Sequence, residues 1–241
     1  MESLNRKIGI ITGGGTGIGR GVSIALAQAG VKVVVCGRRK NRLDETVSII
    51  KAAGGDALSI QADISDPTDV ERLVQEVLKY FGQIDILINN AGIYLDSTDI
   101  QLSMVEDWDK VIATNLRGPY LMTQAVLPTM HAQHGGHIIY ISSEAGLEFN
   151  RGDSVYGTSK HALNALAEFV VRENQDFDIR VNTICPGMVV SEMTENSIGL
   201  DHSKCLYPED IADLVIWLLT RRKNIKIGTP ILIQTMLNPW E

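Results

Sequence analysis

The glycine-rich segment Thr12–Gly19 (TGGGTGIG) is the feature that most constrains how this chain folds. It follows the apolar run 8–11 and precedes apolar residues at helical spacing between 22 and 29, which predicts a strand, a tight turn and a helix. Glycines let the backbone approach a ligand, and a helix N-terminus offers free N–H groups and a positive dipole end to an anion. A pyrophosphate fits such a turn, and a tight strand-to-helix connection is the simpler alternative.

Composition favours one α/β domain over residues 1–241, because the chain is 44% hydrophobic and no linker-like segment divides it. The net charge of −7 leaves no broad basic surface, so we expect neither a nucleic-acid nor a membrane partner. No apolar stretch is long enough to span a bilayer, and the start of the chain lacks the apolar core of a signal peptide. We therefore expect a cytoplasmic protein.

Cysteine and histidine spacing gives no sign of a metal site. Cys36, Cys185 and Cys205 are far apart in the sequence, which favours reduced, partly buried thiols. His131, His134 and His137 recur at every third position, but no nearby carboxylate or cysteine completes a ligand set. We interpret the three histidines as part of a solvated loop before a strand.

Apolar runs alternate with helical patterns along the whole chain, which predicts repeated strand–helix units and a parallel sheet. We expect a doubly wound, seven-stranded Rossmann-like sheet with six helices distributed over both faces. In such a sheet a dinucleotide lies at the carboxyl ends of the strands, beside the point where the strand order reverses. The expected strands are 8–12, 31–36, 57–62, 84–89, 137–142, 179–185 and 229–234.

The second expected strand ends in Gly37-Arg38-Arg39-Lys40, directly before a helix that begins near Asn41. Three cations at a helix N-terminus oppose the helix dipole, and a solvated basic turn is one interpretation. In a dinucleotide-binding domain this strand end meets the adenosine ribose, where an arginine accommodates a 2′-phosphate and an acid accepts a 2′-hydroxyl. The turn holds arginines and no acid.

Two asparagine motifs follow. The fourth strand runs into Asn90-Ala91-Gly92, whose polar start suits a turn. Asn115 shares a helical face with Trp108, Val111 and Ile112, which predicts a buried amide that needs hydrogen-bond partners. A satisfied core asparagine is the simplest interpretation of Asn115.

Tyr156 and Lys160 stand four positions apart at the start of a predicted helix, so they share one face of its first turns. A phenol with a pKa near about 10 is a poor base at neutral pH, and a nearby ammonium lowers that pKa. A tyrosine tuned in this way exchanges protons with an alcohol or a ketone. The pair alone is a common accident of helical sequences.

The joint occurrence of these motifs, with Ser143 at the end of the fifth strand and Pro186-Gly187 after the sixth, resembles the compact single-domain short-chain dehydrogenases/reductases. The resemblance runs from about Lys7 to the last strand. It implies that Tyr156 is the general acid/base and that Lys160 lowers its pKa and contacts the nicotinamide ribose. It further implies that Ser143 positions the substrate oxygen, and that Asn115 holds a water in a proton relay.

The resemblance also implies a set of cofactor-binding positions. Asp63 would border the adenine, and Ser191 stands where the family usually has a threonine that binds the carboxamide. The complete set is Gly13, Gly15, Thr16, Gly17, Ile18, Gly19, Arg38, Arg39, Asp63, Ile64, Asn90, Ala91, Gly92, Tyr156, Lys160, Pro186, Gly187, Val189 and Ser191.

The last quarter of the chain carries two further expectations. The polar stretch 191–206 is expected to form a short substrate lid before a helix that begins near Pro208. The resemblance favours a homotetramer, and the apolar face of Ile211, Leu214, Val215 and Leu218, with Trp240 nearby in sequence, suits an interface. For the tail 235–241 we consider an interface and packing on the chain's own core equally.

We therefore expect an oxidoreductase that uses NADP(H), and less readily NAD(H), on a small carbonyl or alcohol substrate, with no metal ion. Sugar-nucleotide epimerases and dehydratases share the tyrosine–lysine pair but need an added substrate domain that 241 residues do not supply. A non-catalytic dinucleotide-binding redox sensor is the alternative from another functional class.

Overall fold

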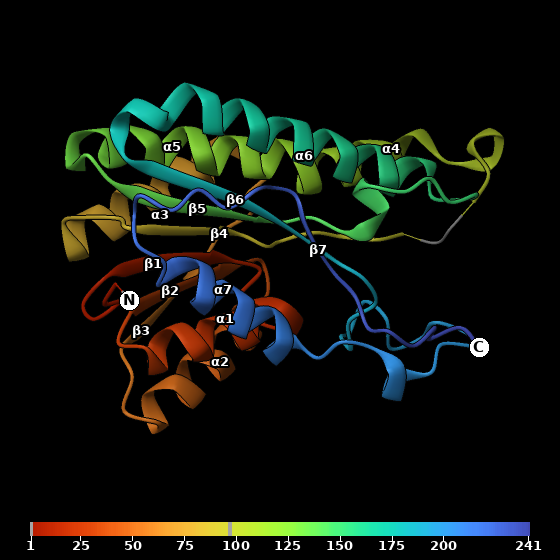
Figure 1. Ribbon diagram of the computed structural model, residues 1–241, viewed down its shortest axis with the longest axis horizontal. Coiled ribbons are helices and arrows are strands. Elements are labelled where there is room, and N and C mark those ends of the chain that lie inside the picture. Colours follow the sequence, from red (N-terminus) through yellow and green to blue (C-terminus); the bar gives the residue numbers. More distant parts are fainter. Residues whose placement is uncertain (1, 96–97) are drawn as a thin grey trace.

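The computed structural model describes residues 2–95 and 98–241, and its centre is a parallel sheet (Figure 1). Within these residues the sheet has seven strands in the order β3-β2-β1-β4-β5-β6-β7, so the order reverses between β1 and β4. This confirms the predicted doubly wound sheet. The strands are β1 (Ile8–Thr12), β2 (Lys32–Gly37), β3 (Ala57–Gln61), β4 (Ile86–Asn89), β5 (Gly136–Ile141), β6 (Ile179–Pro186) and β7 (Ile231–Ile233).

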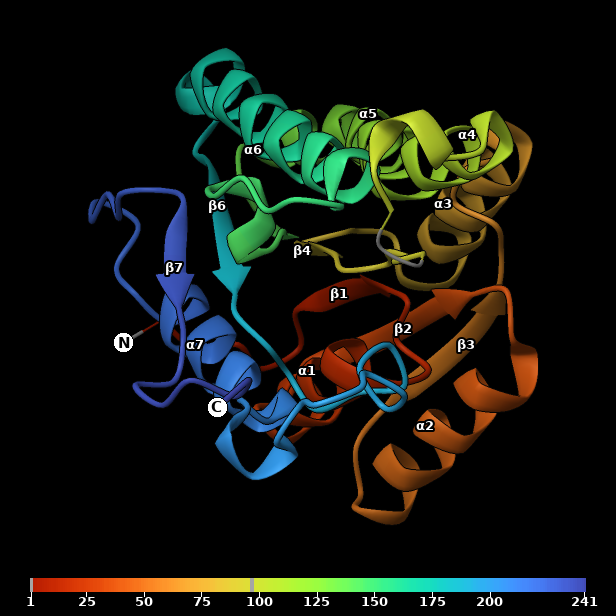
Figure 2. The same ribbon diagram turned by 90° about the vertical axis from the view of Figure 1, so that its right-hand side faces the viewer.

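Helices cover both faces of the sheet, with α1, α2 and α7 on one side and α3, α4, α5 and α6 on the other (Figures 1 and 2). This arrangement follows from the strand order, because right-handed crossovers on the two sides of the reversal place their helices on opposite faces. The helices are α1 (Gly17–Gln28), α2 (Lys40–Ala52), α3 (Pro67–Phe81), α4 (Val105–Ile112), α5 (Gly118–Gln133), α6 (Ser154–Asn174) and α7 (Pro208–Leu219).

Two hydrophobic cores result, one on each face. Along β2 the side chains of Val33 and Val35 join the core beneath α1, α2 and α7, whereas Val34 and Cys36 join the core beneath α3, α5 and α6. This alternation is the period of a strand buried on both faces, and it explains why the strands have near-continuous apolar sequences.

The apolar face of α7 lies in the first of these cores. Ile211, Val215 and Leu218 are fully buried, and Leu214 packs against the same cluster. The expectation that this face forms a subunit interface is therefore wrong, because packing of α7 against α1 already removes it from water. A homotetramer stays a prediction from the family resemblance alone.

The helix number also differs from the expectation of six. The described part of the chain has seven α-helices because the helical run 105–133 is divided by a π-helical turn, Ala113–Arg117. Turns of this kind insert an extra residue into a helix and are common at functional sites. Here the turn contains Asn115, which is completely buried.

The tail after β7 contacts its own chain. The backbone N–H of Asp201 donates to the carbonyl of Pro239 at 2.8 Å, and the Thr235 hydroxyl donates to the carbonyl of Lys204 at 2.8 Å. Leu237 and Trp240 remain 60% and 51% exposed, so neither packs into a core. Among the described residues, none of the helices combines the length and the apolar character needed to cross a membrane.

Hydrogen bonds join β1 to β4 at the point where the strand order reverses. The hydroxyl oxygen of Thr12 accepts from the backbone N–H groups of Asn90 and Ala91, both at 3.0 Å, and the Asn90 side chain donates to the Thr12 carbonyl at 2.8 Å. Thr12 is fully buried, so these groups have no access to water. The contacts hold the glycine turn after β1 against the turn after β4.

We expect Thr12→Val to lower the free energy of unfolding by about 1–3 kcal/mol, because a methyl group would replace the buried acceptor of two N–H groups. Thr12→Ser keeps the hydroxyl and serves as the control. Urea unfolding of the two variants and the wild type gives the comparison. Equal midpoints for the valine and serine variants would show that these hydrogen bonds contribute nothing.

Candidate active site

A cleft of about 450 Å³ opens at the carboxyl ends of the central strands. It extends from the turn after β2, past the glycine turn, to the first turns of α6. Most of the predicted cofactor-binding residues line this cleft, namely Gly13, Gly15, Thr16, Gly17, Ile18, Arg38, Arg39, Asp63, Ile64, Asn90, Ala91, Gly92, Tyr156, Lys160 and Ser191. The fold thus brings together motifs that are distributed over most of the sequence.

The remaining predicted positions lie behind the lining. A Cβ on Gly19 would approach the carbonyl oxygen of Gly13 to 2.3 Å, so this glycine is needed for packing α1 against the turn. The Gly187 N–H donates to the carbonyl of Ile233 at 2.8 Å, and Pro186 ends β6. Val189 is buried in the core beneath α1. These residues shape the cleft wall from behind.

The glycine turn is held close to its neighbours. Gly13 has a φ of 66°, and a Cβ there would lie 2.9 Å from the Ala91 backbone. Gly17 has a φ of 50° and begins α1, so the first turn of this helix faces the cleft. A Cβ on Gly17 would lie 3.3 Å from the side chain of Ser191, which places the segment after β6 directly over the turn (Figure 2).

Arginines form one rim of the cleft. Arg38, Arg39 and Arg42 all line it, and the sequence analysis did not identify Arg42. Arg42 lies one helical turn after the predicted pair, and this spacing is the signal that could have found it. Near the same rim the Asp63 carboxylate accepts hydrogen bonds from the backbone and the hydroxyl of Ser65, at 3.0 and 2.7 Å.

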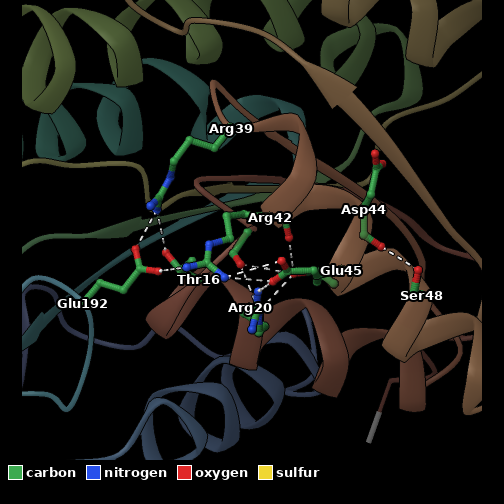
Figure 3. A network of polar contacts seen from close by, with 10 residues as sticks. Thr16, Arg20, Arg39, Arg42, Asp44, Glu45, Ser48 and Glu192 are labelled. Carbon is green, nitrogen blue, oxygen red and sulfur yellow. Dashed lines mark hydrogen bonds and ion pairs between the residues drawn. The ribbon is translucent and has the colours of Figure 1, made fainter.

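The sequence analysis also missed Glu192, whose carboxylate crosses the cleft to this rim (Figure 3). It pairs with Arg39 at 2.8 Å and with Arg42 at 3.2 Å. The Arg39 guanidinium additionally donates to the Thr16 hydroxyl at 3.3 Å. No local pattern signals this contact, because Glu192 lies far from both arginines in the sequence.

Tyr156 and Lys160 line the opposite end of the cleft, and Ser143 directly follows the lining residue Ser142. Tyr156 and Lys160 project from the first turns of α6, as their spacing predicts, and the Ser143 hydroxyl is near enough to lower the pKa of the Tyr156 phenol. The Lys160 ammonium lies 5.5 Å from the centre of the Tyr156 ring and donates to the carbonyl of Ile141 at 3.1 Å. The Ser143 hydroxyl also accepts from the Ala145 N–H at 3.2 Å, which fixes its direction.

Burial is the largest influence on the ionisation of Tyr156 and Lys160. It raises the pKa of Tyr156 to about 12; Ser143 opposes this rise, and Asp153, Tyr94 and Glu144 add to it. Burial lowers the pKa of Lys160 to about 8, and Cys185 acts in the opposite direction. The Lys160 ammonium donates to the carbonyl of Ile141, and its lowering of the Tyr156 pKa stays a prediction.

Tyr94 is a further residue of this end that the sequence analysis did not identify. Its ring meets the Tyr156 ring edge to face, with 5.1 Å between the centroids, and its hydroxyl donates to Asp153 at 3.0 Å. Tyr94 therefore joins the loop after β4 to the start of α6, and it forms one wall of the cleft beside the phenol.

Asn115 fixes the loop after β4. Its amide oxygen accepts from the Ile93 N–H at 2.8 Å, and its amide nitrogen donates to the Ile93 carbonyl at 2.9 Å and to the Ser159 hydroxyl at 3.2 Å. A Cβ on the neighbouring Gly92 would lie 3.6 Å from the Lys160 nitrogen. The asparagine is thus a satisfied buried amide that holds this loop beside Lys160, and its proposed water relay stays a prediction.

The cysteines and histidines lie apart from the cleft lining. All three cysteines are free and buried. The expectation of a solvated histidine loop is wrong for His131, which stacks on Phe177, and for His137, which is buried in β5 and bonded to Asn182. Burial lowers the pKa of His137 to about 3, an effect that nearby Arg180 increases. In the described ranges no cluster of three or more His, Cys, Asp or Glu side chains could hold a metal ion.

Comparisons with known proteins agree with this geometry. Residues 7–199 match the profile of the short chain dehydrogenase family. An uncharacterized oxidoreductase of Staphylococcus aureus is 34% identical over 230 residues, which cover 95% of this chain and 97% of that protein.

Solved structures are similar over almost the whole chain. A metagenomic short-chain oxidoreductase in complex with NADP superposes with a TM-score of 0.84 and 32% identity, covering 96% of this chain and 98% of that one. A short-chain type dehydrogenase/reductase from Mycobacterium marinum gives a TM-score of 0.89 with 30% identity, covering 96% and 95%.

We expect Asn115→Leu to lower the free energy of unfolding by about 1–3 kcal/mol, because it leaves the partly buried N–H and carbonyl of Ile93 without their side-chain partner. Asn115→Asp retains the acceptor for the Ile93 N–H and loses the donors, so its effect separates the two halves of the interaction. Guanidinium unfolding measures both variants. A leucine variant as stable as the wild type would contradict the positioning role of this amide.

Proposed function

The chain belongs to the short-chain dehydrogenase family, and from this premise we propose that it is an NADP(H)-dependent oxidoreductase acting on a small carbonyl or alcohol substrate. The observation that carries the proposal is that Tyr156 and Lys160 line one end of the cleft that the glycine turn begins, with Ser143 near the Tyr156 phenol. A carbonyl group that contacts both hydroxyls would have its oxygen next to a proton donor.

The lining residues fit a dinucleotide. Side chains are excluded at Gly13 by the nearby Ala91 backbone, so a pyrophosphate can lie directly on the turn, at the N-terminus of α1. Asp63 and Ile64 flank the adenosine end, and Ser191 lies over the turn from the other side. When bound, the nicotinamide supplies or accepts the hydride.

Tyr156 manages the proton in this proposal. Because burial raises the pKa of its phenol to about 12, the group is protonated at neutral pH and is suited to donate to a carbonyl oxygen as that carbonyl is reduced. The hydroxyl of Ser143 is near enough to lower the pKa of the phenol and would hold the substrate oxygen in line with it. Lys160 and Asn115 support the loop and the helix that position these groups.

The basic rim supports the choice of NADP(H) over NAD(H). Arg38, Arg39 and Arg42 place three guanidinium groups at the adenosine end of the cleft, where a 2′-phosphate would lie. An arginine binds a phosphate in a bidentate manner, whereas a 2′-hydroxyl carries no charge with which a guanidinium could pair. The NADP complex of the similar metagenomic oxidoreductase agrees with this choice.

The proposal is tested by mixing the purified protein with NADPH and a panel of ketones, aldehydes and 3-oxoacyl thioesters while cofactor absorbance is followed. Oxidation of NADPH with one class of compound supports an enzyme and identifies its substrate class. Binding of NADPH without turnover across the panel would favour the redox-sensor alternative.

The β6–α7 segment, proposed as a lid, contributes Ser191 and Met193 to the cleft.

We expect Tyr156→Phe to lower kcat by about 10²-fold or more, because it removes the transferable proton, while the cofactor Kd changes little. Lys160→Ala should weaken both turnover and cofactor binding. Tyr80→Phe, an exposed tyrosine outside the cleft, is the control. If Tyr156→Phe retained more than a tenth of the wild-type kcat, the acid/base assignment would fail.

Cofactor preference gives a second prediction. Charge-assisted hydrogen bonds contribute roughly 1.5–3 kcal/mol each, so loss of one or two contacts at the rim should change the NADPH preference about ten- to a thousandfold. Arg38→Ala should lower kcat/KM with NADPH and leave kcat/KM with NADH nearly unchanged. Equal values for the two cofactors in the wild type, or no decrease with NADPH in the variant, would exclude the proposed preference.

A further inference from the structure

Glu192 is the only acidic side chain that the described residues place in ion pairs with Arg39, and it also pairs with Arg42. It comes from the segment between β6 and α7, whereas both arginines come from the start of α2 and the turn before it. The carboxylate therefore bridges two walls of the cleft at the arginine rim, as Figure 3 shows. Its neighbours Ser191 and Met193 line the same cleft.

These ion pairs use the donors that a phosphate group would need. A carboxylate and a phosphate both bind the planar fork of a guanidinium, so they compete for the same N–H groups. One Arg39 nitrogen is further engaged by the Thr16 hydroxyl at 3.3 Å. A 2′-phosphate that binds here has either to displace Glu192 or to lie next to its negative charge.

The pairs are weak enough to be exchanged. The side chains of Arg39 and Arg42 are 58% and 40% exposed, and that of Glu192 is 38% exposed. Ion pairs with this exposure contribute little, because water screens them and two long side chains lose rotational freedom. A dianionic phosphate with several acceptor oxygens is the stronger ligand for the same cations.

Glu45 also pairs with an arginine of the rim, but it lies outside the cleft lining. Glu45 pairs with Arg42 at 3.2 Å and with Arg20 of α1 at 3.0 Å (Figure 3). Glu45 is absent from the cleft lining, whereas Glu192 is part of it. Asp63 and Glu192 are the acidic residues that the described part of the chain contributes to the cleft lining, and of the two Glu192 is the one with ion pairs to the arginine rim.

We propose that Glu192 is a determinant of cofactor specificity, whose carboxylate occupies Arg39 and Arg42 and competes with the 2′-phosphate of NADP(H). Glu192 thereby keeps the affinity for NADP(H) below the value that the arginines alone would give. It also reduces the factor by which NADP(H) is preferred over NAD(H). This inference deepens the proposed function and rests on the assignment of the arginine rim to the 2′-phosphate.

The test measures Kd by calorimetry for NADP⁺ and NAD⁺, and for adenosine 2′,5′-bisphosphate and adenosine 5′-monophosphate, which probe the adenosine end alone. Glu192→Gln should tighten the two 2′-phosphorylated ligands about three- to tenfold, since it removes exposed ion pairs, and change the other two less than about twofold. Glu195→Gln is the matched control. It removes the same charge from the same segment, and among the described residues Glu195 has no ion-pair partner.

A double-mutant cycle identifies the groups through which Glu192 acts. In an Arg39→Gln, Arg42→Gln background, Glu192→Gln should no longer tighten NADP⁺ binding, because the two guanidinium groups for which the carboxylate and the phosphate compete have been removed. Glu192→Asp keeps the charge on a shorter side chain and should bind NADP⁺ with an affinity between those of the wild type and Glu192→Gln. This variant also provides a second measurement if Glu192→Gln proves unstable.

Three results would overturn the proposal: unchanged NADP⁺ affinity in Glu192→Gln, weaker NADP⁺ affinity in that variant, or an equal gain in Glu195→Gln. Failure of the proposed cofactor preference is recognised separately. A wild type that binds NADP⁺ and NAD⁺ equally well contradicts that preference, whereas the Glu192 proposal then stands only if Glu192→Gln alone tightens NADP⁺.

Discussion

The buried hydrogen bonds between Thr12 and the Asn90-Ala91 backbone are the interaction on which the rest of the site depends. They join the ends of β1 and β4, the two strands between which the strand order reverses. Helices leave this point toward opposite faces of the sheet, so a crevice at the strand ends is a consequence of topology. The threonine fixes the position of the turn after β1 relative to the turn after β4, and both turns line the crevice.

The site concentrates polar groups that burial makes costly. Lys160 is 4% exposed and Asn115 is fully buried; the Lys160 ammonium donates to the carbonyl of Ile141 at the end of β5, and Asn115 binds the backbone of the loop after β4. Such groups stabilise a fold only when all their hydrogen bonds are made. The same hydrogen bonds that offset desolvation also orient α6, and with it Tyr156, toward the cleft. Folding and positioning of the candidate acid therefore rely on one set of contacts.

Electrostatics divides the cleft into two unlike ends. At the end that holds Tyr156 and Lys160, desolvation raises the pKa of the phenol and lowers that of the ammonium to about 8. At the arginine rim, exposed arginines and Glu192 form pairs that water screens. Desolvation therefore governs the charges at the first end, and screened ion pairs govern them at the second.

By itself, the sequence determined the strands, the α/β class, the glycine turn and the Tyr156–Lys160 face, because hydrophobic period and helical spacing are local properties. Strand limits differ from the expected ones by at most two residues. Only the tertiary structure decided that the apolar face of α7 lies in the core, that burial raises the pKa of Tyr156, and that Glu192 meets Arg39 and Arg42. Burial and long-range ion pairs depend on which segments pack together, and no window of sequence contains that information.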